Sequence, residues 1–171
     1  SLSVAPLTSD GTTVTIAGLL LAQRGVDAVT TTKSPSAAES REVGEMGETI
    51  RVLPFDLADP EAVERAGAAA DELHGGIDVL VLCGGVSQRA LFAEVSLETM
   101  DRLLQVDYRS AVSLVKRCLP LMERQGSGRI VAVTSLAAKI GAPLRTGYCA
   151  AKHALQGFCD ALRPEVASLG I

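Results

Sequence analysis

The chain has 171 residues, a length that suits one domain with a sizeable hydrophobic core. Hydrophobic residues make up 47% of the sequence but aromatic residues only 3%, so the core must be aliphatic, as is typical of a parallel sheet covered by helices. The net charge of −4 and the lack of a basic cluster exclude nucleic acid as an expected partner.

Cysteine and histidine usage argues against a metal site and a disulfide framework. The four cysteines and two histidines lack metal-ligand spacing, so we expect reduced, mostly buried thiols in a reducing compartment and no bound metal. Residues 14–22 form the longest strongly apolar run, which is too short to cross a bilayer. No basic region precedes this run, so we expect no signal peptide and no transmembrane segment. Localisation stays open between the cytoplasm, taken by default, and membrane association through an N-terminal anchor upstream of Ser1.

The first part of the chain predicts short strands separated by turns and helical segments. In chain order we expect a strand at residues 1–7, a polar turn at 8–13, a helix at 14–24, a strand at 26–31, a short polar helix or loop at 34–47 and a strand at 49–55. Gly25 is a suitable end for the first helix. The β-branched run that follows Gly25 is typical of a strand.

The second part predicts longer helices that alternate with buried strands. In chain order we expect a helix at residues 59–73, a strand at 77–83, a helix at 96–124, a strand at 129–134 and a helix at 146–169. Asp59 and Pro60 supply an N-cap and a first helical residue for the first of these helices. Pro120 and Pro164 fall inside the two later helices and predict a kink or a break in each.

This alternation predicts an α/β fold, a doubly wound parallel sheet with helices on both faces and right-handed crossovers. We see no repeat or linker, and we therefore expect one domain over residues 1–171. Ligands of such sheets bind outside the carboxyl ends of the strands. Cys83, Gly84 and Gly85 follow one predicted strand and Ser135 follows another, which places them at that edge.

Ser135, Tyr148 and Lys152 are the candidates for catalytic chemistry. Tyr148 and Lys152 are four residues apart in a predicted helix and therefore share a face. A free tyrosine has a pKa of about 10, but a neighbouring cation favours the phenolate. Such a phenol can exchange a proton with an alcohol oxygen, and a serine hydroxyl can hydrogen-bond the developing oxyanion. The trio suits interconversion of an alcohol and a carbonyl beside a hydride carrier; an exposed tyrosine–lysine pair is the alternative interpretation of Y-x-x-x-K alone.

Ser135 and the pair Tyr148-x-x-x-Lys152, on this order of strands and helices, resemble the short-chain dehydrogenase/reductase family. Two further runs carry the resemblance: L-P-F-D-L at residues 53–57 and I-D-V-L-V-L-C-G-G-V-S-Q-R at residues 77–89. With the later run G-Y-C-A-A-K-H-A-L-Q-G-F-C-D-A-L-R-P-E, they are most similar to the dehydrogenase/reductase member-seven branch and its bacterial look-alikes. The resemblance covers the chain from about residue 26 onward and implies a Rossmann-like domain.

The resemblance implies a function and roles for individual residues. Tyr148 would be the general acid/base, Lys152 would favour its phenolate and bind the nicotinamide ribose, and Ser135 would hold the substrate oxygen. The chain would then be an NAD(P)(H)-dependent oxidoreductase that interconverts an alcohol and a ketone or aldehyde, of the carbonyl reductase type. Its partners would be an apolar small molecule and further copies of itself in a homo-oligomer.

The resemblance also implies a set of cofactor-binding residues. These are Gly11, Lys33, Asp56, Leu57, Cys83, Gly84, Gly85, Tyr148 and Lys152. Lys33 follows the second predicted strand, and residues 30–33 contain no acid that would bind a ribose 2′-hydroxyl. This favours NADP(H) over NAD(H), although an ordinary solvated lysine is the alternative interpretation of Lys33. Gly84 and Gly85 likewise have two interpretations: they allow close approach of a cofactor, or they simply form a turn.

Three features depart from the family pattern. Residues 8–14, where the family has its glycine-rich loop, read T-S-D-G-T-T-V, with Gly11 as the only glycine. Asp107 stands where the family usually has an asparagine of the catalytic set, and its carboxylate is expected to weaken the effect of Lys152 on Tyr148. The sixth strand and the substrate lid of the family do not follow, so we expect a domain truncated after the catalytic helix.

These departures leave a second hypothesis open, that of a non-catalytic or truncated relative acting as a binding or oligomerisation scaffold. Such a chain would pair through the helices expected at residues 96–124 and 146–169. Ser135, Tyr148 and Lys152 favour the enzyme, because a scaffold has no use for this chemistry.

Overall fold

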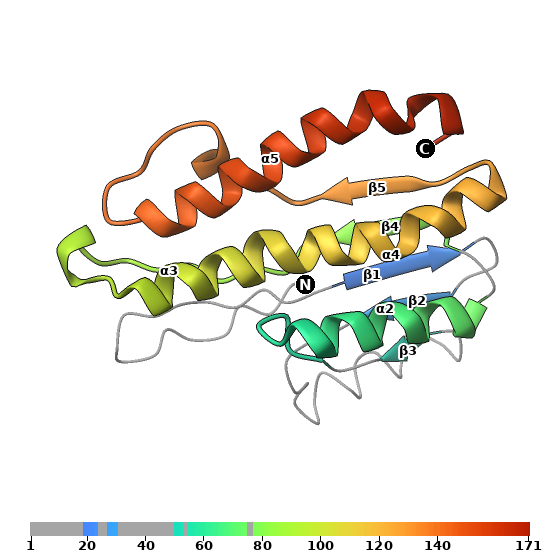
Figure 1. Ribbon diagram of the computed structural model, residues 1–171, viewed down its shortest axis with the longest axis horizontal. Helices are drawn as coiled ribbons and strands as arrows, with labels where there is room; N and C mark the ends of the chain where they lie inside the picture. The colour runs from blue at the N-terminus through green and yellow to red at the C-terminus, as the bar shows by residue number, and fades with distance from the viewer. Residues whose placement is uncertain (1–18, 24–26, 31–49, 53–54, 75–76) are drawn as a thin grey trace.

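Five strands form one sheet (Figure 1). The computed structural model describes residues 19–23, 27–30, 50–52, 55–74 and 77–171. The strands are β1 (Leu19–Gln23), β2 (Asp27–Thr30), β3 (Ile50–Val52), β4 (Val79–Leu82) and β5 (Arg129–Ala132). Their order across the sheet is β3-β2-β1-β4-β5, which is the order of a doubly wound α/β sheet.

Strand β1 differs from the expectation in both type and direction. β2 pairs in parallel with β3, and β4 pairs in parallel with β5, whereas β1 runs antiparallel to both of its neighbours, β2 and β4. The helix predicted over residues 14–24 is therefore wrong for residues 19–23. Their run L-L-L-A-Q is short and apolar, and periodicity alone does not separate a buried strand from a helix in such a run. The strand predicted at residues 1–7 and the polar segment at 34–47 lie outside the described residues.

The helices lie close to their predicted positions. They are α2 (Pro60–His74), α3 (Leu97–Leu104), a π-helical turn (Gln105–Arg109), α4 (Ser110–Gln125) and α5 (Thr146–Val166). Asp59 caps α2 as expected, since its Oδ1 accepts hydrogen bonds from the N–H groups of Glu61 at 2.9 Å and Ala62 at 3.2 Å. The long helix expected at 96–124 is present as a continuous helical run from Leu97 to Gln125, in which the π-helical turn separates α3 from α4.

The two prolines inside helices do not end them. α4 continues past Pro120 to Gln125, and α5 continues past Pro164 to Val166. Both prolines are on exposed sides of their helices, where freed backbone groups are accessible to water. α4 ends instead at Gly126, whose φ of 67° is the left-handed conformation that glycine adopts without penalty.

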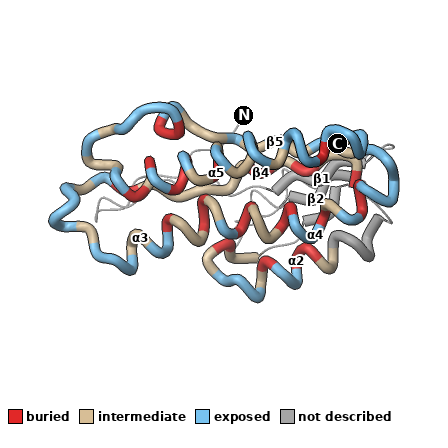
Figure 2. Tube along the Cα trace, turned by 45° about the horizontal axis from the view of Figure 1, so that its top comes forward, coloured by how far each residue is buried: buried red, intermediate tan, exposed pale blue. Residues whose placement is uncertain are grey.

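Helices α2, α4 and α5 lie on one face of the sheet, as Figure 1 shows. Buried and exposed residues alternate along each of these helices (Figure 2), which is the pattern of helices that pack by one side. The polar segment expected at residues 34–47 lies outside the part of the chain that the structure describes, so it is not assigned to either face.

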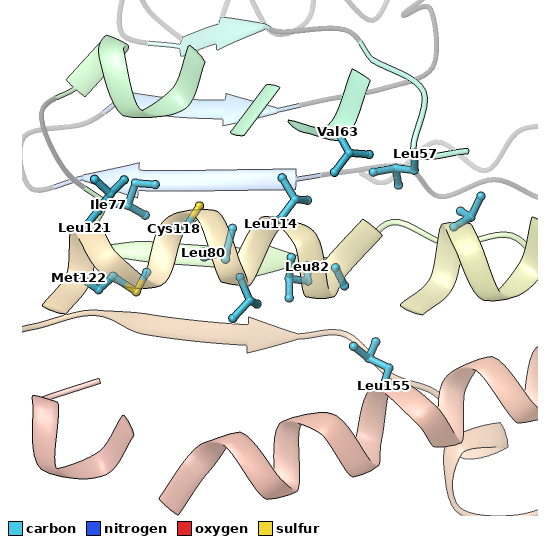
Figure 3. Packing of buried hydrophobic residues seen from close by; sticks show 13 residues of the cluster. Leu57, Val63, Ile77, Leu80, Leu82, Leu114, Cys118, Leu121, Met122 and Leu155 are labelled. Carbon is cyan, nitrogen blue, oxygen red and sulfur yellow. The ribbon is translucent and has the colours of Figure 1, made fainter. Parts of the chain in front are cut away.

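The hydrophobic core lies between β4 and the helices that cover it (Figure 3). Leu80 of β4 and Met122 of α4 are completely buried, and Val63 of α2 and Leu155 of α5 are buried beside them. Each fully buried aliphatic side chain of this size contributes roughly 1.5–3 kcal/mol. This packing positions α4 and α5 over β4, and the loop that follows β4 contacts the π-helical turn and the first turn of α5.

Candidate active site

A buried ion pair lies at the edge of the sheet where β4 and β5 end. The Nζ of Lys152, in α5, is 3.9 Å from Oδ1 of Asp107, in the π-helical turn. Lys152 is 4% exposed and Asp107 is 1% exposed, so water screens their charges poorly. π-helical turns inside α-helices often occur at functional sites, because the extra residue turns a side chain inward. The pair makes this edge the most polar part of the described interior.

Asp107 also holds the loop that follows β4. Its Oδ1 accepts a hydrogen bond from the backbone N–H of Val86 at 2.7 Å. Its Oδ2 is buried and has no hydrogen-bond partner among the described residues. Burial raises the pKa of Asp107 from 3.8 to about 6, against the lowering effects of the Lys152 charge and of the Val86 N–H. The carboxyl is therefore mostly ionised at pH 7 and mostly protonated below pH 5.

Gly85 leaves room for this ion pair. A Cβ added at Gly85 would lie 2.6 Å from Oδ1 of Asp107 and 3.1 Å from Nζ of Lys152. The side chain of any other residue would therefore displace the pair. Gly84 and Cys83 precede it; burial raises the pKa of the half-buried Cys83 thiol, while its own backbone and the Lys152 charge lower it. Gly85 thus has a packing reason, and its expected contact with a cofactor stays a prediction.

Tyr148 lies one helical turn before Lys152, as the spacing predicted. The centre of its ring is 5.7 Å from Nζ of Lys152 and 5.8 Å from Cζ of Arg145. Cations at such distances interact favourably with an aromatic ring. The half-buried phenol therefore lies in positively charged surroundings, one cation of which, Lys152, has Asp107 as its counter-ion.

Ser135 follows β5 and begins the short 3-10 turn Leu136–Ala138. Its Oγ accepts a hydrogen bond from the backbone N–H of Ala137 at 3.2 Å. A hydroxyl that accepts in this way still has its own hydrogen to donate. Among the described residues, no hydrogen bond joins Ser135 to Tyr148 directly, and the structure places Ser135 at the expected sheet edge without closing the trio into one network.

The other predicted cofactor residues have mixed outcomes. Gly11 and Lys33 lie outside the described residues. Asp56 forms a local turn, in which its Oδ1 accepts a hydrogen bond from the N–H of Ala58 at 2.9 Å. The side chain of Leu57 belongs to the hydrophobic core, and its carbonyl accepts a hydrogen bond from Gln105 at 3.3 Å. A cofactor contact of Asp56 or Leu57 stays a prediction.

The structure gives two further residues a clear place in the site, and of these only Arg145 was missed from the sequence. Gln88, which is 4% exposed, accepts a hydrogen bond from the N–H of Tyr148 at 3.2 Å. Arg145 approaches the Tyr148 ring and donates a hydrogen bond to Oγ of Ser87 at 3.1 Å. From the sequence, the run S-Q-R at residues 87–89 was open to two interpretations, a segment over the site that could touch substrate and a surface loop.

Other chemistry-bearing groups are accounted for by packing. Cys149, beside Tyr148, is buried, and its Sγ accepts a hydrogen bond from the N–H of Ala142 at 3.4 Å. His153 is an exposed residue of the α5 face that contacts the Cys149 carbonyl at 2.8 Å. Within the described ranges, no group of histidine, cysteine and acidic side chains is arranged to hold a metal ion. Nor does any helix described here have the length and apolar character needed to span a membrane.

Residues 10–171 match a family model described as short chain dehydrogenase. The chain is 45% identical over 119 residues to Dehydrogenase/reductase SDR family member 7 of Homo sapiens, an alignment that covers 70% of this chain and 35% of that protein. It is 39% identical over 152 residues to family member 7B of Bos taurus, covering 88% of this chain and 46% of that protein. The chain therefore spans between a third and a half of the length of these relatives.

Solved structures of similar fold confirm the α/β fold class. A short-chain dehydrogenase from Streptomyces avermitilis superposes with a TM-score of 0.80 at 26% identity, covering 86% of this chain and 54% of that one. A putative NAD(P) dependent gluconate 5-dehydrogenase from Beutenbergia cavernae, with bound NADP, superposes with a TM-score of 0.72 at 32% identity, covering 78% and 53%.

Proposed function

The chain belongs to the short-chain dehydrogenase/reductase family, on its member-seven branch, and from this premise we propose that it is part of an NAD(P)(H)-dependent oxidoreductase that interconverts an alcohol and a ketone or aldehyde. The observation that carries the proposal is the buried ammonium of Lys152, 5.7 Å from the ring centre of Tyr148, beside the carboxyl ends of β4 and β5. Burying a lysine away from water is unfavourable, so its position next to a phenol points to chemistry.

In the reductive direction Tyr148 donates its phenolic proton to the carbonyl oxygen, and in the oxidative direction the phenolate accepts the proton of the alcohol. Lys152 favours the phenolate through its charge. The hydroxyl of Ser135 donates a hydrogen bond to the substrate oxygen as negative charge develops there. A bound nicotinamide would supply a hydride to the carbonyl carbon, or accept one from the alcohol carbon, which completes the two-electron exchange.

The residues at the sheet edge fit the ribose of such a cofactor. A ribose hydroxyl is both a donor and an acceptor, and the polar groups that the site offers it include the ammonium of Lys152. Gly84 and Gly85 carry no side chain that would cover these groups from the end of β4. NADP(H) in preference to NAD(H) is supported by Lys33 and by the lack of an acid at residues 30–33.

We propose that the substrate is an apolar small molecule. Leu136, next to Ser135, is 81% exposed, and Leu91, in the loop that carries Gln88, is 58% exposed. Exposed leucines in the segments that follow β4 and β5 suit a substrate whose carbonyl is flanked by hydrocarbon. The expected homo-oligomer stays a prediction.

The test is turnover by Tyr148→Phe, with Tyr108→Phe as the matched control. Tyr108 is the other tyrosine of the chain, and its ring packs edge-on against Phe158, with 6.4 Å between centres. Oxidation of NADPH is followed with a panel of apolar ketones and aldehydes, and cofactor affinity is measured separately. We expect Tyr148→Phe to lower kcat by at least about a hundredfold while cofactor affinity is kept, and Tyr108→Phe to leave kcat within about twofold. Equal activity in both variants refutes the proposal, and a chain without turnover or cofactor binding supports the scaffold hypothesis.

A further inference from the structure

Gln88 supplies a cap to the helix that carries Tyr148. The N–H group of Tyr148 belongs to the first turn of α5, where backbone donors have no partner within the helix. Arg145, which precedes α5, makes no side-chain cap. Oε1 of Gln88, sixty positions earlier in the sequence, accepts this N–H at 3.2 Å instead. The position of the first turn of α5 is therefore set by the loop that follows β4.

Two further hydrogen bonds join the same two segments. Nη1 of Arg145 donates to Oγ of Ser87 at 3.1 Å, and the N–H of Ala90 donates to the carbonyl of Leu144 at 3.1 Å. Leu144 has a φ of 65°, a conformation that costs free energy for a residue with a Cβ and that persists where its surroundings impose it. We call these three hydrogen bonds, between residues 87–90 and residues 144–148, the clasp.

The loop of the clasp is also tied to the ion pair. The N–H of Val86, two residues before Gln88, donates to Oδ1 of Asp107, the partner of Lys152. One short loop thus contacts the counter-ion of Lys152 at one point and the backbone of Tyr148 at another. The loop therefore restrains the backbone of Tyr148 and the counter-ion of Lys152.

We propose that Gln88 is a positioning residue for Tyr148, an inference that rests on the proposed function. Helix ends fray, and the first turn of α5 carries the phenol whose oxygen must meet the substrate. The amide of Gln88 binds the backbone of Tyr148 itself, so its hydrogen bond restrains the residue that performs the proton transfer. The exposed leucines nearby contribute no comparable restraint.

The nitrogen of the Gln88 amide indicates that this residue is not there for stability alone. Its Nε2 is buried and has no hydrogen-bond partner among the described residues. A buried amide nitrogen without a partner is unfavourable, and an apolar side chain of similar size avoids that penalty. Gln88→Met therefore loses one hydrogen bond but also removes an unpartnered group, so its effect on stability is small while its effect on the position of Tyr148 is not.

The test compares Gln88→Met with Gln125→Met in the full chain. Gln125 also binds backbone far away in sequence, since its Oε1 accepts from the N–H of Ile77 at 2.8 Å, at the amino end of β4 and away from the site. We expect Gln88→Met to lower kcat by roughly tenfold to a hundredfold with KM for the cofactor unchanged. We also expect faster hydrogen exchange at the Tyr148 amide, measured by mass spectrometry on peptides that contain it. Gln125→Met should lower the melting temperature and change neither quantity at Tyr148.

Unchanged exchange at the Tyr148 amide in Gln88→Met overturns the inference, as does a rise in KM with unchanged kcat. If Gln88→Met does not fold, Gln88→Glu keeps an acceptor oxygen in the same place, and exchange at the Tyr148 amide close to that of the unmodified chain is then required. The two proposals fail separately. If the chain shows no turnover but exchange at the Tyr148 amide is faster in Gln88→Met, the proposed function is contradicted and the capping role of Gln88 is supported. If turnover needs Tyr148 but not Gln88, only the inference is contradicted.

Discussion

Lys152 and Asp107 form a buried ion pair, with Nζ 3.9 Å from Oδ1, in the position where the proposed acid/base Tyr148 needs a cation. A carboxylate at this distance offsets part of the charge that Lys152 presents to the phenol. The pair is therefore both a structural anchor for α5 and a control on the chemistry of its first turn. The predictions below separate these two effects.

The stability of the chain should depend on pH through Asp107. The pKa of Asp107 is raised from 3.8 to about 6 in the folded state. At a pH between these two values, Asp107 therefore keeps its proton in the folded chain and has released it in the unfolded chain. The contribution of Asp107 to the free energy of unfolding is then full below pH 4 and is lost as pH rises through about 6, by up to about 3 kcal/mol.

Asp107→Asn should remove this dependence. Its free energy of unfolding, measured by urea denaturation at pH 4, 5, 6 and 7, should rise relative to that of the unmodified chain as pH increases. Asp101→Asn, at an exposed position of α3, is the control and should change the free energy of unfolding little. A constant difference for Asp107→Asn across this range would contradict the raised pKa.

The same substitution should change catalysis in a chain that turns over substrate. Without the carboxylate, the full charge of Lys152 acts on the Tyr148 ring, 5.7 Å away, and the phenolate becomes more favourable. The rate of alcohol oxidation at neutral pH should therefore rise in Asp107→Asn. The measurement is the pH profile of kcat. An unchanged profile in a variant that binds cofactor normally would show that Asp107 does not act on Tyr148.

The elements predicted correctly depend on local patterns. Apolar runs located β4 and β5, Asp59 marked the start of α2, and the i, i+4 spacing placed Tyr148 beside Lys152. Residues 19–23 were misassigned because a short leucine run has no period that separates helix from strand.

The parts of the site that could not be predicted join residues far apart in the chain. The Asp107–Val86 and Gln88–Tyr148 hydrogen bonds connect residues 21 and 60 positions apart. Local periodicity carries no information on which polar side chain of a loop turns inward. Asp107 was singled out because the family has another residue there, and the ion pair with Lys152 agrees with the expectation that its carboxylate acts on that lysine.

Gly85→Ala should disturb the ion pair directly. The added Cβ would lie 2.6 Å from Oδ1 of Asp107, so the carboxylate has to move and its contact with Val86 is lost. We expect a loss of about 1–3 kcal/mol in the free energy of unfolding. Gly157→Ala is the control, because a Cβ on this exposed glycine of α5 meets no atom within 4 Å. It should stabilise the chain by about 0.5–1 kcal/mol; equal destabilisation by both variants would contradict the packing reason for Gly85.

Lys152→Met should leave Asp107 as a buried carboxylate without its cation. The charge of Lys152 lowers the pKa of Asp107, so that pKa should rise above about 6 in the variant. Removing one member of a buried pair costs about 3 kcal/mol in the free energy of unfolding at pH 7. The cost should shrink at pH 5, where the carboxyl is largely protonated with or without Lys152. Lys139→Met, at an exposed position, is the control and should have little effect.

The double variant Lys152→Met/Asp107→Asn should be more stable at pH 7 than Lys152→Met alone, because no uncompensated charge remains buried. The double-mutant cycle, measured by urea denaturation, should give a coupling of at least about 1 kcal/mol between the two positions. Strictly additive effects would mean that the 3.9 Å pair carries no interaction of its own. The anchoring of α5 would then rest on its other contacts, which include the clasp of Gln88 and the packing of Leu155 in the core.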